Sequence, residues 1–292
     1  MTALLATPEL LSDDDVLVTP RPVPLRHAWY PTSPCGEHCR ATDPDAAVGR
    51  LMVALRLIRL AVTVLMLVVV GAMVSMTPRI VRRRYLRMAS RGLLSAIGVR
   101  IDVDDRRPYA SSTRGLVVAN HISYLDILAL AVVSPAHFVA KSDVAHMSVI
   151  SGLARRFGVI TIERDSLRTL PTVVADAVAR LHRDSSVAVF PEGTTWCGAE
   201  QGRFRPAFFQ AAIDAGVPVI PVRLGFHTPA GTSTAASFIG DDTPADTLRR
   251  VLRTRGLTMH VRVHELQLPT ADRRVLAARC ERLLAPSYPF AS

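Results

Sequence analysis

The chain has 292 residues, enough for one sizeable hydrophobic core, or for one core with an appendage. Its hydrophobic content of 49% and mean hydropathy of +0.25 are high for a soluble enzyme and indicate contact with a membrane. The net charge of +10 implies an anionic partner, but an aromatic content of 5% leaves few side chains to stack on single-stranded nucleic acid. Composition therefore favours an acidic lipid or a phosphorylated substrate over nucleic acid.

Residues 1–45 are predicted to form a loosely packed arm. They contain seven Pro and the acidic run Asp13-Asp14-Asp15, a composition that is poor in core-forming residues. The chain does not open with a basic segment followed by an apolar one, so the arm does not resemble a secretory signal.

The four Cys give no disulfide framework over this length. In the arm, Cys35-Gly36-Glu37-His38-Cys39 brings three possible metal ligands close together, but no second pair with zinc-finger spacing follows. Cys197 and Cys280 are predicted to be isolated reduced thiols, as expected for a protein on the cytosolic side. The sequence thus predicts no metal site and no bound redox cofactor.

Residues 46–98 are predicted to form a membrane-associated helical hairpin. Between residues 46 and 101 the chain has ten Arg and no acidic residue, so this segment matches the net charge of the whole protein. The run from Leu60 to Met76 holds seventeen residues without a charge, close to the lower limit for spanning a bilayer about 30 Å thick. Snorkelling of Arg56 and Arg59 toward the lipid headgroups is expected to lengthen this run.

The second helix of the hairpin, at about 78–97, is amphipathic and basic. Apolar residues occupy one side at helical spacing and six Arg dominate the other, which suits an anionic lipid interface. The first helix either spans the membrane with its Arg-rich end in the cytoplasm, or dips with the second helix into one leaflet. A further alternative is a buried core helix followed by a solvated basic helix.

Residues 99–292 are predicted to form an α/β domain with a central mixed sheet flanked by helices, because strand and helix patterns alternate. Strands are expected at about 99–103, 116–119, 137–141, 159–162, 187–190, 217–224 and 258–264. Helices are expected at about 127–131, 148–157, 167–182, 207–215, 246–255 and 270–284. The Gly- and Pro-rich stretch 225–244 is predicted to be a loop.

Two polar residues mark the switch from the strand 115–119 to the helix that follows. The imidazole of His121 is of the side-chain type that most often takes a proton from an alcohol. If His121 precedes the first helical turn, Asp126 can reach one ring nitrogen, fix the tautomer and stabilise the imidazolium. Ser123 lacks the frame of a nucleophile elbow. The pair therefore indicates direct activation of a substrate hydroxyl, without a covalent enzyme intermediate.

Four sequence blocks in this domain resemble those of the glycerolipid acyltransferase family, whose best-known members are lysophosphatidic acid acyltransferases. They are His121-x4-Asp126, Gly158 to Arg164, Phe190-Pro191-Glu192-Gly193-Thr194, and Val217-Pro218-Val219-Ile220-Pro221. Each block alone is weak evidence, but their order and spacing across about residues 115–223 match the family. The resemblance favours a helical hairpin at the membrane surface over a spanning helix.

Several residues are expected to bind substrate. By resemblance, Arg164 takes the phosphate of the lysophospholipid acceptor, and its guanidinium fork suits two phosphate oxygens. The other candidates are Lys141, Glu192, Gly193, Thr194, Arg203 and Arg205. Many family members have Arg where this chain has Thr195, and a small polar residue where it has Trp196. Either Arg203 and Arg205 supply the second phosphate-binding cation, or the departure marks a different acceptor.

The expected activity is that of an O-acyltransferase on the cytoplasmic face of the cell membrane. It moves a fatty acyl chain from acyl-CoA or acyl carrier protein to lysophosphatidic acid, giving phosphatidic acid. Lyso-ornithine lipid, another lysophospholipid or glycerol phosphate are alternative acceptors. A non-catalytic protein that binds anionic lipid through its basic helix is a second class, against which the intact His121–Asp126 pair argues. Nucleic-acid binding rests on charge alone, and the adjacent apolar run argues against it.

Overall fold

The computed structural model describes residues 30–40, 47–108, 113–141, 159–162, 167–183 and 185–286. Contacts along the chain separate Met1–Tyr30 from the compact unit Pro31–Ser292, and the fold below is that of the second unit. Residues 1–29 of the predicted arm and the helix predicted at 148–157 lie outside the described residues.

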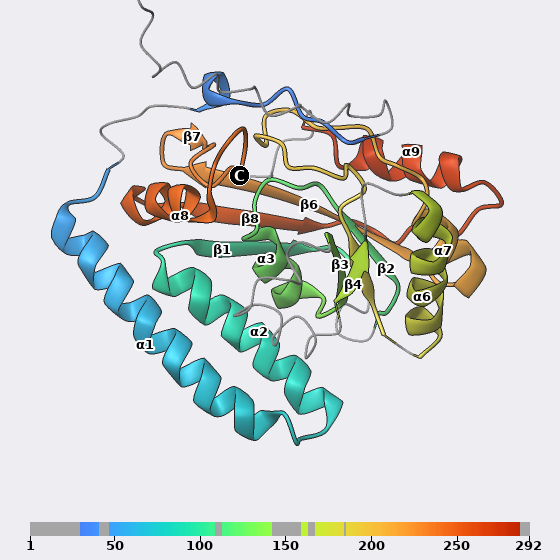
Figure 1. The fold of residues 1–292 in the computed structure, drawn as a ribbon, viewed down its shortest axis with the longest axis horizontal. Helices are drawn as coiled ribbons and strands as arrows, with labels where there is room; N and C mark the ends of the chain where they lie inside the picture. Colours follow the sequence, from blue (N-terminus) through green and yellow to red (C-terminus); the bar gives the residue numbers. More distant parts are fainter. Residues whose placement is uncertain are drawn as a thin grey trace, which may run out of the picture. The chain divides into compact units, whose positions relative to one another are not determined.

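A mixed sheet forms the centre of this unit, as the sequence predicts (Figure 1). The described strands are β1 (Arg100–Asp105), β2 (Leu116–Ala119), β3 (His137–Lys141), β4 (Ile160–Ile162), β5 (Val187–Val189), β6 (Val219–Thr228), β7 (Gly231–Thr232) and β8 (Thr258–Val263). Their order across the sheet is β1-β8-β6-β2-β5-β3-β4, with β7 paired to β6. The strands β6, β2, β5, β3 and β4 run parallel to one another, whereas β8 is antiparallel to β6 and parallel to β1.

Helices cover both faces of the sheet because its strands are apolar on both faces. In β2, Val117 and Ala119 pack into one core, and Leu116 and Val118 pack into the other. The first core is closed by α2 (Arg79–Ala96), α3 (Asp126–Val133) and α8 (Pro244–Arg253). The second is closed by α6 (Leu170–His182), α7 (Phe209–Ala215) and α9 (Arg273–Leu283). Short 3-10 turns η1 (Glu37–Cys39) and η3 (Leu167–Thr169) complete the described helices.

The N-terminal hairpin consists of α1 (Arg50–Val74) and α2, which lie side by side (Figure 1). The Tyr85 hydroxyl of α2 donates to the Leu67 carbonyl of α1, which fixes the two helices against each other. The most apolar window of α1 has no buried share, so the alternative of a buried core helix is wrong. By length and composition α1 is able to cross a membrane: its 25 residues span about 37 Å.

The predicted snorkelling of Arg56 is also wrong, because this side chain is buried against the α/β part. Its Nη1 donates to the carbonyl oxygens of Leu252 (2.8 Å) and Thr254 (2.9 Å) at the C-terminus of α8. A Cβ at Gly98, whose φ is +86°, would lie 2.3 Å from Cζ of Arg56, so only glycine leaves room for the guanidinium. These buried hydrogen bonds join α1 to carbonyls at the C-terminus of α8, where the last turn of a helix leaves carbonyl oxygens without partners in the helix.

Strand β6 extends beyond its predicted end at Leu224. Residues Gly225 to His227 pair with β8 in the register Gly225↔His260 and His227↔Thr258. The Gly residue and the polar composition of this stretch predict a loop, but pairing with β8 and burial of Phe226 outweigh that local tendency. The predicted loop therefore begins only after Thr228.

Candidate active site

The carboxyl ends of the parallel strands bring the predicted site residues to one edge of the sheet. Because β2, β5 and β3 run in the same direction, His121 after β2, Glu192 after β5 and Lys141 at the end of β3 belong to that edge. Strand β4 ends there as well, since it is parallel to β3. Residues far apart in the sequence are thus gathered by the topology of the sheet.

The sequence folds His121 and Asp126 into direct contact. His121 precedes α3, whose first residue is Asp126, so the chain turns between them instead of continuing a helix. The Nδ1 atom of His121 lies 2.9 Å from Oδ2 of Asp126. The same Oδ2 accepts the backbone N–H groups of Ile122 (2.6 Å) and Ser123 (2.8 Å), so the carboxylate also closes the turn. Residues five apart do not share one face of a regular helix, but the turn before α3 brings His121 and Asp126 into contact.

The imidazole of His121 is held on one side and open on the other. Its ring stacks on Phe190, with ring centroids 3.9 Å apart and an interplanar angle of 13°. Asp126 is fully buried, whereas the side chain of His121 is 16% exposed. With Nδ1 engaged, Nε2 makes no hydrogen bond to any part of the chain that the structure describes. The arrangement leaves Nε2 available to accept a proton from a bound hydroxyl.

Asn120, which the sequence analysis did not single out, fixes the strand end that carries His121. Its buried side-chain amide donates to the Leu224 carbonyl (3.0 Å), and its carbonyl oxygen accepts the Leu224 N–H (2.8 Å). The side chain thereby continues the pairing of β2 with β6 beyond Ala119. The available signal was an Asn directly after a buried strand, where a buried amide must find backbone partners.

Glu192 lies beneath the turn and is 4% exposed. Its Oε2 accepts the N–H of His121 (2.7 Å) and its Oε1 accepts the N–H of Gly202 (3.1 Å). Burial raises the pKa of Glu192 to about 8, although these two hydrogen bonds lower it. Oε2 therefore joins the β5 turn to the backbone of His121, and Oε1 joins it to the backbone of Gly202. Contact of Glu192 with substrate stays a prediction.

The raised pKa of Glu192 predicts a pH-dependent stability. Its pKa is about 8 when folded and near 4.5 when unfolded, so between these values the folded chain keeps a proton that the unfolded chain has released. Stability from this group is therefore present below about pH 4.5 and is lost as the pH rises through 8. The loss is at most about 5 kcal/mol, at about 1.4 kcal/mol per pKa unit.

Denaturant unfolding of the wild type and Glu192→Gln at pH values between 5 and 8 measures this loss. The wild type is expected to lose stability relative to Glu192→Gln as the pH rises, because the amide does not titrate. Glu200→Gln, at an exposed position, is the matched control and should follow the wild type. Parallel curves for the wild type and Glu192→Gln would show that Glu192 does not keep its proton in the fold.

The turn after Glu192 carries the other predicted binding residues. Gly193 has φ +77°, which favours glycine, and Nε of Arg205 lies 3.6 Å from the place where its Cβ would be. Arg205 also donates its backbone N–H to the Pro191 carbonyl (2.9 Å), so the structure brings it beside the turn. Arg203 is exposed two residues earlier, and Thr194 is half-buried in the turn. None of the ion pairs among the described residues includes Arg203 or Arg205.

Arg164 and Lys141 are the other two residues predicted to bind phosphate. Arg164 lies outside the described residues, two positions after the last residue of β4. Lys141 is described as the last residue of β3, and its register with Ile162 of β4 is known. Their roles stay predictions.

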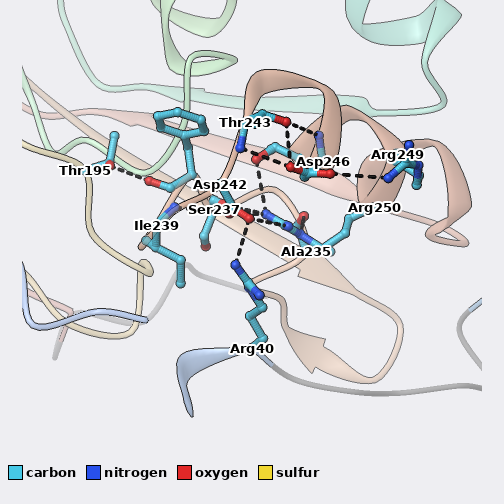
Figure 2. Close-up of polar contacts among 12 residues, drawn as sticks. Arg40, Thr195, Ala235, Ser237, Ile239, Asp242, Thr243, Asp246, Arg249 and Arg250 are labelled. Atoms are coloured by element: carbon cyan, nitrogen blue, oxygen red, sulfur yellow. Dashed lines mark hydrogen bonds and ion pairs between the residues drawn. The ribbon is translucent and has the colours of Figure 1, made fainter. Parts of the chain in front are cut away.

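The residues that depart from the common family pattern have structural contacts of their own. The Thr195 hydroxyl donates to the Phe238 carbonyl (Figure 2). The N–H of Trp196 donates to the carbonyl of His121 (2.8 Å). The indole covers Gly202, where a Cβ would lie 2.5 Å from Nε1. Trp196 thus connects the turn to His121, and Thr195 connects it to Phe238.

One further group contradicts a sequence prediction. Cys197 is not an isolated thiol, because its Sγ lies with those of Cys35 and Cys39, all within 4.8 Å of one another. The sequence separation of Cys197 from the arm hid this contact. Cys280 lies apart from these three, buried in α9 against the second core.

Comparison with known proteins identifies the family. A family model described as "Acyltransferase" matches residues 100–225, which contain every predicted site residue. A lyso-ornithine lipid O-acyltransferase of Pseudomonas aeruginosa is 30% identical over 246 residues, covering 80% of this chain and 93% of the relative. A 1-acyl-sn-glycerol-3-phosphate acyltransferase of Neisseria meningitidis is 33% identical over 181 residues, covering 62% of this chain and 70% of the relative. The chain belongs to the acyltransferase family.

The fold of this acyltransferase is also similar to that of a solved structure. The crystal structure of the 1-acyl-sn-glycerophosphate acyltransferase PlsC from Thermotoga maritima matches with a TM-score of 0.56. The match covers 81% of this chain and all of the other chain, at 16% sequence identity. At that identity the likeness concerns the fold, and it confirms the predicted sheet flanked by helices.

Proposed function

We propose that this acyltransferase transfers a fatty acyl chain from a thioester to the free hydroxyl of a lysophospholipid, with lysophosphatidic acid as the acceptor and phosphatidic acid as the product. The observation that carries the proposal is the His121–Asp126 pair, at 2.9 Å, with Nε2 of His121 left without a partner among the described residues. Family membership supports acyl transfer, and the pair supplies the general base that such a reaction uses.

The proposed reaction begins with proton transfer from the acceptor hydroxyl to Nε2 of His121. The hydroxyl oxygen attacks the thioester carbonyl at the same time, and a tetrahedral intermediate forms. When this intermediate collapses, the carbon–sulfur bond breaks and the imidazolium returns its proton to the leaving thiolate. Asp126 stabilises the imidazolium between these steps and keeps Nδ1 protonated, as an oriented carboxylate does in other His-based sites. No residue of the chain becomes acylated in this scheme.

The acceptor phosphate is assigned to Arg side chains. Arg164 takes the main share, together with Lys141 or with Arg203 and Arg205, and the position of Arg205 beside the Gly193 turn supports its inclusion. Gly193 and Thr194, positioned by the buried Glu192, shape the acceptor pocket. The preference of guanidinium groups for phosphate oxygens favours a phosphorylated acceptor.

The second candidate acceptor is lyso-ornithine lipid, which lacks a phosphate. It is favoured by the relative from Pseudomonas aeruginosa, because that match covers 93% of the relative's length. The donor in either case is acyl-CoA or acyl carrier protein as co-substrate, with no metal or redox cofactor in the reaction.

The enzyme is assigned to the cytoplasmic face of the cell membrane, where the hairpin α1–α2 contacts the lipid. The exposed apolar surface of α1 supports this assignment, as do the many Arg of α2. Such a location brings a lipid hydroxyl from the bilayer to His121.

Acyl transfer to a panel of acceptors tests the proposal. Purified full-length enzyme is given oleoyl-CoA or palmitoyl acyl carrier protein with lysophosphatidic acid, lyso-ornithine lipid or glycerol 3-phosphate, and the products are identified by mass spectrometry. Lysophosphatidic acid is expected to react fastest. Arg164→Ala is expected to raise KM for lysophosphatidic acid by about 10-fold or more, as loss of a charged hydrogen bond predicts, with little change in kcat.

Arg273→Ala, at an exposed position on α9, is the matched control and should leave KM unchanged. Transfer to lyso-ornithine lipid alone would replace the proposed acceptor while keeping the reaction class. Absence of transfer to every acceptor would contradict the proposal as a whole.

A further inference from the structure

We propose that Cys35, Cys39 and Cys197 bind a Zn²⁺ ion through three thiolates. Their three Sγ atoms lie within 4.8 Å of one another, although Cys197 is 162 residues from Cys35. Neither the family resemblance nor the acyl-transfer chemistry calls for a metal, so this inference stands apart from the proposed function.

The spacing of the sulfur atoms fits a zinc ion better than a disulfide. Zinc–thiolate bonds are about 2.3 Å long, so thiolates at tetrahedral positions lie about 3.8 Å apart. Three sulfurs within 4.8 Å reach that geometry by small side-chain movements. A disulfide needs two sulfurs at about 2.0 Å and would leave the third thiol unused. Thiolates are also soft ligands, and Zn²⁺ is the common divalent ion that prefers them.

The local structure of the arm arranges its two thiols for a common ligand. Cys35-x3-Cys39 has the short spacing found in structural zinc sites, and the turn η1 follows Cys35 and ends at Cys39. The Cys39 N–H donates to the Gly36 carbonyl (3.0 Å), which folds the segment back so that both thiols face Cys197. The sequence shows no second ligand pair near Cys35 and Cys39, but the fold supplies Cys197 as a third thiol.

The surroundings of the thiols are those of a shielded ligand set. Cys35 is 5% exposed and Cys197 is 3% exposed, and Ile239 and Trp196 pack against them. The Cys197 N–H points at Sγ of Cys35 (3.3 Å), a hydrogen bond of the kind that steadies a bound thiolate. The apolar neighbours shield Cys35 and Cys197 from bulk solvent, and the N–H offsets part of the negative charge of the sulfurs.

An independent contact docks the same segment of the arm. Nη2 of Arg40 lies 2.7 Å from Oδ1 of Asp242, and Oδ2 of Asp242 lies 2.6 Å from Nη2 of Arg250 (Figure 2). Although burial acts to raise it, hydrogen bonds from Arg250 hold the pKa of Asp242 below its usual value, so the carboxylate is charged. Because Arg40 follows Cys39 directly, this ion pair fixes the segment beside Cys197 without any metal.

The bound ion would tie the arm to the loop that carries Cys197. Trp196, the preceding residue, donates its N–H to the carbonyl of His121. The zinc would therefore stabilise the backbone around the candidate base while staying outside the reaction. Among the described residues no other His, Cys, Asp or Glu joins this group, so the fourth ligand would be water or the exposed His38 after a side-chain rotation.

Metal analysis of the purified full-length enzyme tests the site. Expressed with zinc in the medium, the wild type is expected to hold about one Zn²⁺ per chain, as a structural site does. Cys35→Ser, Cys39→Ser and Cys197→Ser are each expected to weaken zinc binding by at least about 100-fold, more than loss of an outer partner costs. Cys280→Ser is the matched control, because it removes the thiol outside the cluster and should keep the ion.

A second measurement keeps the test valid if a variant fails to fold. The wild type is stripped with a chelator, its fold is checked by circular dichroism, and Co²⁺ is added. A thiolate-to-cobalt charge-transfer band that Zn²⁺ abolishes supports the site. The proposal is overturned if the folded wild type binds neither ion, if it holds iron and sulfide instead, or if non-reducing peptide mapping finds a disulfide among the three Cys.

Discussion

Replacing His121 with Ala is expected to lower kcat/KM for acyl transfer by about 10²–10⁴-fold, the usual contribution of a general base. Nε2 is the atom of this residue expected to accept the proton, because Asp126 holds Nδ1 and Nε2 has no partner among the described residues. The side chain stacks on Phe190 and contacts Asp126, but the hydrogen bonds that join His121 to Glu192 and Trp196 are made by its backbone N–H and carbonyl. The variant should therefore fold with these contacts intact.

Initial rates with lysophosphatidic acid and an acyl thioester measure this effect, together with the midpoint of thermal unfolding. His182→Ala provides the matched control, because His182 is an exposed residue at the end of α6. It should keep the rate of the wild type. A His121→Ala enzyme that is as fast as the wild type would remove this imidazole from the mechanism.

The sheet was largely predictable because its strands carry a strong local signal. Leu116 to Ala119 and Val187 to Val189 are short, apolar and rich in β-branched residues, and both form strands near the expected bounds. The helix predicted at about 207–215 ends at the expected place, where Gly216 adopts φ +62°. In these elements the local preference and the tertiary packing agree.

The errors arise where a distant partner decides the structure. Arg56 is buried instead of snorkelling because its guanidinium binds carbonyls at the C-terminus of α8, and Leu252 is 196 residues further along the chain. The end of β6 depends on pairing with β8. No local pattern reports such contacts, since the free energy that fixes them comes from groups elsewhere in the sequence.

The candidate site shows the same division. The order of its motifs predicted which strand ends carry polar residues, and the sheet brings those ends to one edge. It did not predict that both oxygens of Glu192 are occupied by backbone N–H groups, one of them 71 residues away. Nor did it predict that Cys197 meets the arm, because a single Cys in a loop carries no signal of its partners.

Asp126→Asn is expected to lower kcat by about 10²–10⁴-fold while leaving the turn before α3 intact. The reason lies in the unequal use of the two oxygens. Oδ2 accepts from Ile122, Ser123 and His121, whereas Oδ1 is buried without a hydrogen-bond partner among the described residues. An Asn side chain with its oxygen at the Oδ2 position keeps both backbone bonds and places its NH₂ where Oδ1 was. The turn survives, but the negative charge that stabilises the imidazolium is lost.

Comparison with Asp126→Ala distinguishes loss of the negative charge from loss of the hydrogen bonds that close the turn. This variant removes the acceptor of two buried backbone N–H groups, so it is expected to cost about 1–3 kcal/mol of stability for each group left unpaired, in addition to the loss of rate. Measured side by side, Asp126→Asn should unfold close to the wild type and Asp126→Ala well below it, with both slow in acyl transfer. A fast Asp126→Asn enzyme would mean that the negative charge is not needed, and that an oxygen that accepts a hydrogen bond from Nδ1 of His121 is enough to hold the base.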